Sequence, residues 1–158
     1  MSIFNDDVME AFASGMLNAV CEYVSNVIGC EMLFNPKVTL EEAVRRGFEE
    51  SSVDDTYERY GIETIFRLLE RSDYKSYEEL DVLRKKYTDK VMKLCVNFYK
   101  KALTETYEKN PGMSTEELSD ILSDDLTLSG SVYNENYMIR KIMKLLREYE
   151  ERVNAVEW

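Results

Sequence analysis

Apolar side chains recur every three or four residues along most of this chain, which is the spacing of one face of an α-helix. The longest such stripe falls in residues 77–108 and consists of Leu80, Leu83, Tyr87, Val91, Leu94, Phe98 and Ala102. Shorter stripes of the same kind predict helices over residues 6–28 and 133–155. Because long runs of strict apolar–polar alternation are lacking, the pattern leaves little room for a β-sheet.

Helix start and stop signals divide the chain further. Start signals are the N-cap candidate Asn5 and three Ser/Thr-x-x-Glu capping boxes that begin at Thr39, Ser76 and Ser114. Stop signals are Gly29, Asn35-Pro36 and Asn110-Pro111-Gly112. These signals add short helices over residues 40–50 and 115–124. They also add a helical stretch between residues 52 and 69 that Gly61 is expected to break or bend.

The elements together predict an all-α fold. We expect one helical domain spanning residues 1–158, built as a bundle of about six to seven helices, because each apolar stripe has to be buried against another. The helix over residues 77–108 would measure roughly 48 Å at about 1.5 Å per residue. That length predicts that it is the long central helix of the bundle.

Composition limits the catalytic and metal-binding chemistry that the chain can support. The 158-residue chain has no histidine and only three cysteines, Cys21, Cys30 and Cys95. Without histidine the commonest general base and every histidine-dependent triad are missing, and the cysteine spacing does not fit a zinc site. We therefore predict that the protein is not an enzyme and has no catalytic residue, metal site or cofactor.

The same features favour a cytoplasmic protein. Three unpaired thiols are typical of a reducing compartment, and the N-terminus lacks the basic flank of a signal peptide. The longest uncharged run, residues 11–21, is too short to span a bilayer, so we expect no contact with a membrane.

Negative charge is concentrated in the first half of the chain. The net charge is −11, and residues 1–70 carry 14 acidic but only five basic side chains. We call residues 41–60 the acidic segment. Clustered carboxylates beside tyrosines are typical of a protein-binding face and are steered toward Lys- and Arg-lined grooves. The candidate partner-binding residues are Glu41, Glu42, Glu49, Glu50, Asp54, Asp55, Tyr57, Glu58 and Tyr60.

Basic side chains form two groups in the second half. One group is Lys86, Lys90 and Lys93, extended by Lys100 and Lys101; the other is Arg140, Lys141, Lys144 and Arg147. The simplest interpretation is that both are solvated faces beside acidic helices of the same bundle. A nucleic-acid site is less favoured because the field of such an acidic chain repels phosphate, and we expect no direct nucleic-acid binding.

The main hypothesis is a non-enzymatic, acidic, helical protein that binds a protein partner with a basic surface. In size and charge alone, not in any motif, the chain is similar to small acidic proteins of phages and mobile elements, including anti-CRISPR and DNA-mimic inhibitors. That similarity implies an inhibitor that occludes a basic, nucleic-acid-handling surface of its target.

Two alternatives come from other classes. All-α Mg²⁺-dependent nucleotide pyrophosphohydrolases use acid-x-x-acid pairs from facing helices. The corresponding pairs here are Asp7/Glu10, Asp55/Glu58, Glu70/Asp73, Glu78/Asp81, Glu105/Glu108, Glu117/Asp120 and Glu148/Glu151, and about six are expected by chance in so acidic a chain. The other alternative is a helical scaffold, a homo-oligomer in which the stripe over residues 80–102 is partly an intersubunit seam.

Overall fold

The computed structural model describes residues 4–34, 57–70, 78–109, 111–114 and 135–155, and the single residues 37, 39, 42, 45, 46 and 117. Four helices make up most of this part: α1 (Asp6–Phe34), α3 (Tyr57–Leu68), α4 (Glu78–Lys109) and α6 (Glu135–Asn154). The predicted all-α, single-domain bundle is confirmed. The predicted number of helices is corrected, because the described residues form a bundle of four helices rather than six or seven.

The two predicted short helices, over residues 40–50 and 115–124, lie largely outside the described residues. The N-cap hydrogen bond of each capping box is nevertheless formed: the Glu42 N–H donates to Thr39 Oγ1 at 3.2 Å, and the Glu117 N–H donates to Ser114 Oγ at 3.1 Å. Both glutamates have helical backbone conformation. The start signals at these two places are therefore confirmed, while the capping box at Ser76 lies outside the described residues.

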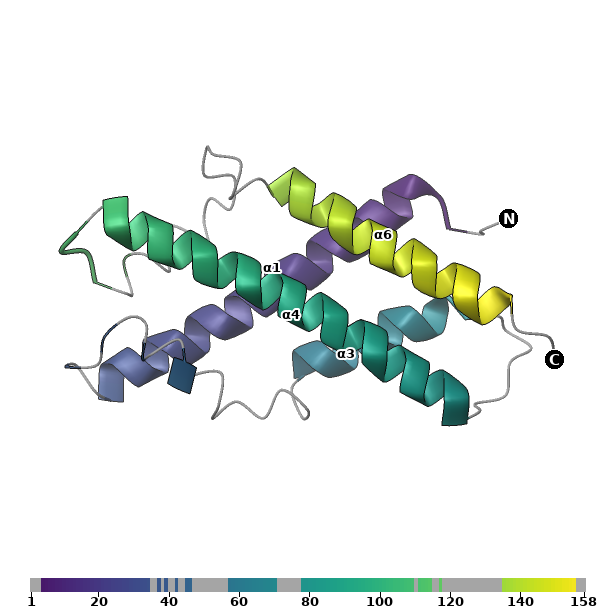
Figure 1. Ribbon diagram of the computed structural model, residues 1–158, viewed down its shortest axis with the longest axis horizontal. Helices are drawn as coiled ribbons and strands as arrows, with labels where there is room; N and C mark the ends of the chain where they lie inside the picture. The colour runs from purple at the N-terminus through teal and green to yellow at the C-terminus, as the bar shows by residue number, and fades with distance from the viewer. Residues whose placement is uncertain are drawn as a thin grey trace.

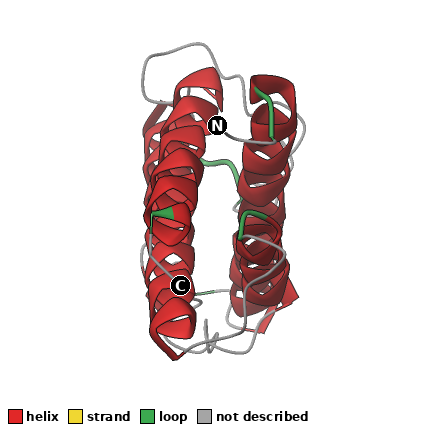
Figure 2. Ribbon diagram, turned by 90° about the vertical axis from the view of Figure 1, so that its right-hand side faces the viewer, coloured by secondary structure: helices red, strands yellow, loops and turns green. Residues whose placement is uncertain are grey.

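The four helices form two layers. In Figure 1, α4 and α6 lie in front, while α1 runs diagonally behind both and α3 lies behind the first half of α4. Figure 2 shows the two layers edge on. The helix α1 packs against both α4 and α6, and α3 packs mainly against α4. At 32 residues, α4 is the longest described helix and extends along the whole bundle, as expected of the central helix.

Helix boundaries follow proline and capping residues more closely than glycine. The side chain of Asn5 caps α1, since its Oδ1 accepts the Val8 N–H at 2.9 Å. The prediction that Gly29 ends this helix is wrong, because α1 continues to Phe34. Glycine keeps its N–H and costs a helix only about 1 kcal/mol, whereas the following Asn35-Pro36 removes a donor and disfavours the helical backbone before it.

The predictions for Gly61 and Gly112 have opposite outcomes. The expected break or bend at Gly61 is absent, because α3 is continuous from Tyr57 to Leu68. The stop signal after α4 is confirmed: the helix ends at Lys109, and Gly112 has a φ of 95°, a left-handed conformation that favours glycine.

The core lies between the two layers, where the apolar stripes meet. Its largest fully buried side chains are Met9, Met16, Leu17, Phe66, Tyr87, Tyr99, Ile142 and Tyr149. The long stripe of α4 is covered within the single chain, since Leu80, Val91 and Ala102 are at most 3% exposed. Among the described helices, none is long and apolar enough to cross a membrane.

Candidate functional site

The structure describes only part of the acidic segment. Five of the nine candidate residues lie outside the described part: Glu41, Glu49, Glu50, Asp54 and Asp55. Glu42 is exposed, and Tyr57 is the first residue of α3. Glu58 is half-buried in the first turn of α3, and Tyr60 is 63% exposed. The described end of the acidic segment is therefore the start of α3.

The outer face of α3 carries exposed apolar side chains. Tyr60, Thr64 and Leu68 are four residues apart and share this face, and Leu68 is 53% exposed. Between the two apolar side chains, Thr64 Oγ1 donates to the Tyr60 carbonyl oxygen at 2.9 Å. By contrast, three other tyrosines of the bundle are fully buried: Tyr87, Tyr99 and Tyr149. Tyr60 thus stands out as an exposed ring directly beside the carboxylates.

An ion pair fixes the start of α3 on the bundle. Arg59, whose side chain is 8% exposed, donates from Nη1 to Asp89 Oδ1 of α4 at 2.5 Å. Its Nε lies 3.5 Å from Glu63 Oε1, one turn further along α3. Because Arg59 is held from the inner side of α3, the neighbouring Tyr60 is held in an outward orientation.

A buried polar cluster joins the end of α3 to α4 and α6. Glu70 Oε1 accepts hydrogen bonds from Tyr149 OH at 2.5 Å, Arg84 Nε at 3.0 Å and Arg84 Nη2 at 2.8 Å. Arg84 Nη1 also donates to Asp81 Oδ1. Burial raises the pKa of Tyr149, and the hydrogen bond to Glu70 raises it further. Burial acts to lower the pKa of Arg84, but its contacts with Glu70 and Asp81 outweigh that effect and the pKa is raised.

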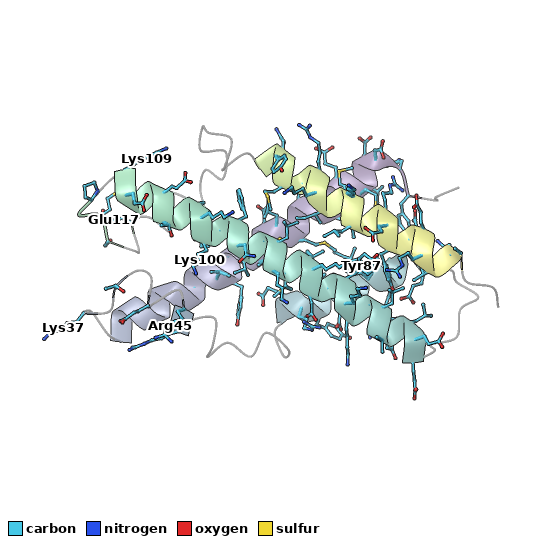
Figure 3. The ribbon with its side chains drawn as sticks, viewed as in Figure 1. Lys37, Arg45, Tyr87, Lys100, Lys109 and Glu117 are labelled. Atoms are coloured by element: carbon cyan, nitrogen blue, oxygen red, sulfur yellow. The ribbon has the colours of Figure 1, made fainter. Side chains whose placement is uncertain are left out.

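A second cluster surrounds the hydroxyl of Tyr87 between α4 and α6 (Figure 3). This hydroxyl donates to Glu148 Oε1 at 2.7 Å and accepts from Arg152 Nη1 at 3.3 Å. Lys90 Nζ lies 4.8 Å from the centre of the Tyr87 ring. Burial raises the pKa of Tyr87. The hydrogen bond from Tyr87 lowers the pKa of Glu148, and the nearby positive charges of Lys90 and Arg152 lower it further.

Sequence analysis did not bring these residues together. The only available signal was that Tyr87 and Tyr149 sit on core-facing stripes, where a buried hydroxyl requires a hydrogen-bond partner. The partners come from distant parts of the chain: Glu148 is 61 positions after Tyr87, and Tyr149 is 79 positions after Glu70. In both clusters carboxylates and basic side chains from different parts of the chain contact each other or a shared tyrosine hydroxyl, which points to a role in holding the helices together.

The described residues offer little for metal or thiol chemistry. They contain no group of three or more His, Cys, Asp or Glu side chains placed to hold a metal ion. Two members of the acid-x-x-acid pairs, Glu70 and Asp81, are both engaged by Arg84. Cys21 and Cys95 are buried, and burial raises the pKa of the Cys95 thiol well above its ordinary value, which disfavours the reactive thiolate.

No protein-family model, curated protein or solved structure matches this chain.

Most lysines of α4 differ from the arginines of the bundle in their ion pairing. Six of them are exposed, and none forms an ion pair with another described residue: Lys85, Lys86, Lys90, Lys93, Lys100 and Lys101. We call these six residues the lysine face (Lys100 is labelled in Figure 3). On α6, Lys141 lies 4.6 Å from the Tyr137 ring centre, and Arg147 pairs with Asp6 of α1 at 3.0 Å. Arg147 thus lies beside an acidic residue of a neighbouring helix, as the simplest interpretation expects. In the lysine face, Lys90 lies near Glu148 of α6, and no ion pair joins the six lysines to other described residues.

Proposed function

We propose that this protein acts by binding another protein through the acidic segment and the adjoining outer face of α3. The observation that carries the proposal is the 63% exposure of Tyr60 at the point where seven carboxylates in 18 residues lead into a firmly held helix. Large aromatic side chains are the residues that most often dominate protein interfaces, and charged residues around them act as the rim.

The charge of the segment specifies the chemistry of the partner. Residues 41–58 contain seven carboxylates against Arg45 and Arg46, so the complementary surface is rich in lysine and arginine. Surfaces of that kind occur on proteins that handle nucleic acids, because phosphate contacts require them. We propose that the chain is an inhibitor that covers such a surface, with its carboxylates in the place of phosphates.

Two features support binding without catalysis. The chain lacks histidine, and the buried side chains of Tyr87, Arg84 and Tyr149 are engaged in contacts with other parts of the bundle. An exposed, charged exterior is then the part of the molecule that other molecules meet, and its effect is on association rates: complementary charges raise them from about 10⁵–10⁶ to as much as about 10⁸–10⁹ M⁻¹ s⁻¹.

The test compares two variants that change the same number of charges. The first carries Glu49→Lys, Glu50→Lys, Asp54→Lys and Asp55→Lys in the acidic segment. The matched control carries four exposed carboxylates of other helices changed to lysine: Glu10, Glu22, Glu108 and Glu151. Both variants and the unchanged protein are used for quantitative affinity capture from the cells that produce the protein, followed by binding kinetics with the captured protein.

We expect the acidic-segment variant to lose the partner and the control to keep it. The association rate should fall by about tenfold or more, and the loss should be larger at low salt, where charges act over longer distances. Tyr60→Ala should instead raise the dissociation rate, since a buried contact of the bound state is removed. Equal capture and equal association rates for all three proteins would contradict the proposal.

A further inference from the structure

The lysine face is a straight row of positive charge along the outside of the bundle. Lys86, Lys93 and Lys100 are seven residues apart, and seven residues complete two turns of a helix, so the three Cα atoms lie almost in line. The row from the first to the last of them is roughly 21 Å long at about 1.5 Å per residue. Lys85, Lys90 and Lys101 flank it on the same exposed side.

The few carboxylates of the described residues that lie near this row already have another partner. Asp89 is the only carboxylate between residues 82 and 104 of α4, and it pairs with Arg59 of α3. Glu148 of α6 lies near Lys90, but it accepts the hydrogen bond of Tyr87. Like charges one helical turn apart, such as Lys86 and Lys90, repel each other by a few tenths of a kcal/mol per pair. A layer of carboxylates placed on the row would remove that repulsion.

We infer that the lysine face binds the acidic segment of a second copy of this chain. Every copy carries both surfaces: a row of exposed lysines on α4 that form no ion pair with other described residues, and a segment with seven carboxylates in 18 residues. Two such contacts related by a two-fold axis close into a dimer, with each acidic segment on the lysine face of the other copy. This inference shares the acidic segment with the proposed function but needs no external partner, so the two can fail separately.

The residue type on the row favours carboxylates over a nucleic-acid backbone. Arginine is the residue that grips phosphate with two parallel hydrogen bonds, and α4 has its one arginine, Arg84, buried against Glu70 and Asp81. The row therefore consists of lysine point charges.

Self-association by this route would regulate the acidic surface. In the dimer the acidic segments are covered, and a basic partner has to displace the lysine face to reach them. Dimerisation therefore competes with the basic partner for the same carboxylates. The dimer weakens with increasing salt, because salt screens both of its contacts.

The first test is the salt dependence of the molecular mass. Sedimentation velocity should show the unchanged protein as a dimer near 0.01 M salt and as a monomer near 1 M, because the Debye length falls from about 30 to about 3 Å. The variant Lys86→Glu, Lys93→Glu, Lys100→Glu should remain monomeric at both. A control with the same change in net charge, Lys37→Glu, Arg67→Glu, Lys109→Glu, should still dimerise. Circular dichroism confirms that each variant is folded.

The second test is restoration by mixing. The lysine-face variant and a variant with Glu49→Lys, Glu50→Lys, Asp54→Lys and Asp55→Lys each lack one side of the contact. In a one-to-one mixture, the reversed lysine face meets the reversed acidic segment, and a heterodimer should form that neither variant forms alone. Carbodiimide cross-linking of a mixture of ¹⁴N- and ¹⁵N-labelled protein should join residues 85–101 of one isotope to residues 41–58 of the other.

Three results would overturn the inference. The unchanged protein could remain monomeric at low salt. All cross-links between the two regions could join peptides of the same isotope, which would place the acidic segment on the lysine face of its own chain. Finally, a monomeric protein could bind a labelled DNA oligonucleotide in a manner abolished by the lysine-face variant but not by its control, which would assign the row to nucleic acid.

Discussion

Replacing Glu70 by leucine should destabilise the bundle more than any change to its exposed charges. Glu70 Oε1 accepts three hydrogen bonds, one from Tyr149 and two from Arg84. The side chains of Glu70 and Arg84 are only 11% and 6% exposed. In Glu70→Leu, Arg84 keeps only its contact with Asp81, and the hydroxyl of Tyr149 is left without this acceptor.

The expected loss of stability in Glu70→Leu follows from the buried charge of Arg84, which loses its main partner. Removing one partner of a buried ion pair costs about 3–5 kcal/mol, because the other charge stays buried. The surviving contact of Arg84 with Asp81 places the loss near the lower end of that range. Tyr149→Phe, which keeps the ring and the ion pair, should cost about 1.5–3 kcal/mol, the usual value for a hydrogen bond to a charged group.

A double-mutant cycle separates this network from simple loss of packing. Once Glu70 is leucine, removing the Tyr149 hydroxyl should cost little or become favourable, so the two losses should differ from additivity by about 1 kcal/mol or more. Urea unfolding followed by circular dichroism measures all four proteins. The exposed substitution Glu79→Gln serves as the control and should stay within about 0.5 kcal/mol of the unchanged protein. A loss below about 1 kcal/mol for Glu70→Leu, or strict additivity with Tyr149→Phe, would refute this account of the cluster.

Three further predictions concern single sites. Asn5→Ala should lower the free energy of unfolding by about 1 kcal/mol because it removes the cap on the Val8 N–H, whereas Asn5→Ser should preserve it; equal stability of both variants would contradict the cap. Because the pKa of Tyr149 is raised on folding, its contribution to stability is complete below the ordinary tyrosine pKa of about 10 and is lost as pH rises above it. Urea unfolding at increasing pH should therefore show a shallower decline in Tyr149→Phe, and parallel declines would count against the raised pKa. In a Cys30→Ala background, a thiol reagent should modify Cys95 only as fast as the protein unfolds, and rapid modification of the native protein would contradict its burial.

The long helices could be predicted closely because their signals are local. The predicted helix over residues 77–108 is Glu78–Lys109 in the structure, and the one over 133–155 is Glu135–Asn154. Each amphipathic stripe is contained in its own helix, and each lies beside a capping or stop signal that acts over a few residues. The errors at Gly29 and Gly61 have one cause: a glycine inside an apolar stripe costs less than the burial of that stripe returns.

The polar clusters could not be predicted, because their members come from distant parts of the chain. Whether the tyrosine hydroxyl at position 149 faces water or a carboxylate depends on how α6 meets the end of α3. Tyr87 and Tyr149 lie on apolar stripes and are fully buried, but the stripes do not indicate which carboxylate each hydroxyl contacts. The candidate site remains a prediction for the five residues outside the described part of the chain, and its described end is the exposed Tyr60 on a helix fastened by Arg59.

The division between arginine and lysine connects the fold to the proposed binding surfaces. Four arginines of α3, α4 and α6 contact carboxylates or a tyrosine hydroxyl outside their own helix: Arg59, Arg84, Arg147 and Arg152. The planar fork of arginine suits such fixed contacts, while lysine holds a hydrated charge on a flexible stem. Since stability depends on the arginines, the lysine face and the acidic segment can be reversed in sign at small cost to folding. Charge reversal on either surface should therefore report on binding with the bundle intact, and a reversal that unfolds the protein would show that the surface charges hold the helices together after all.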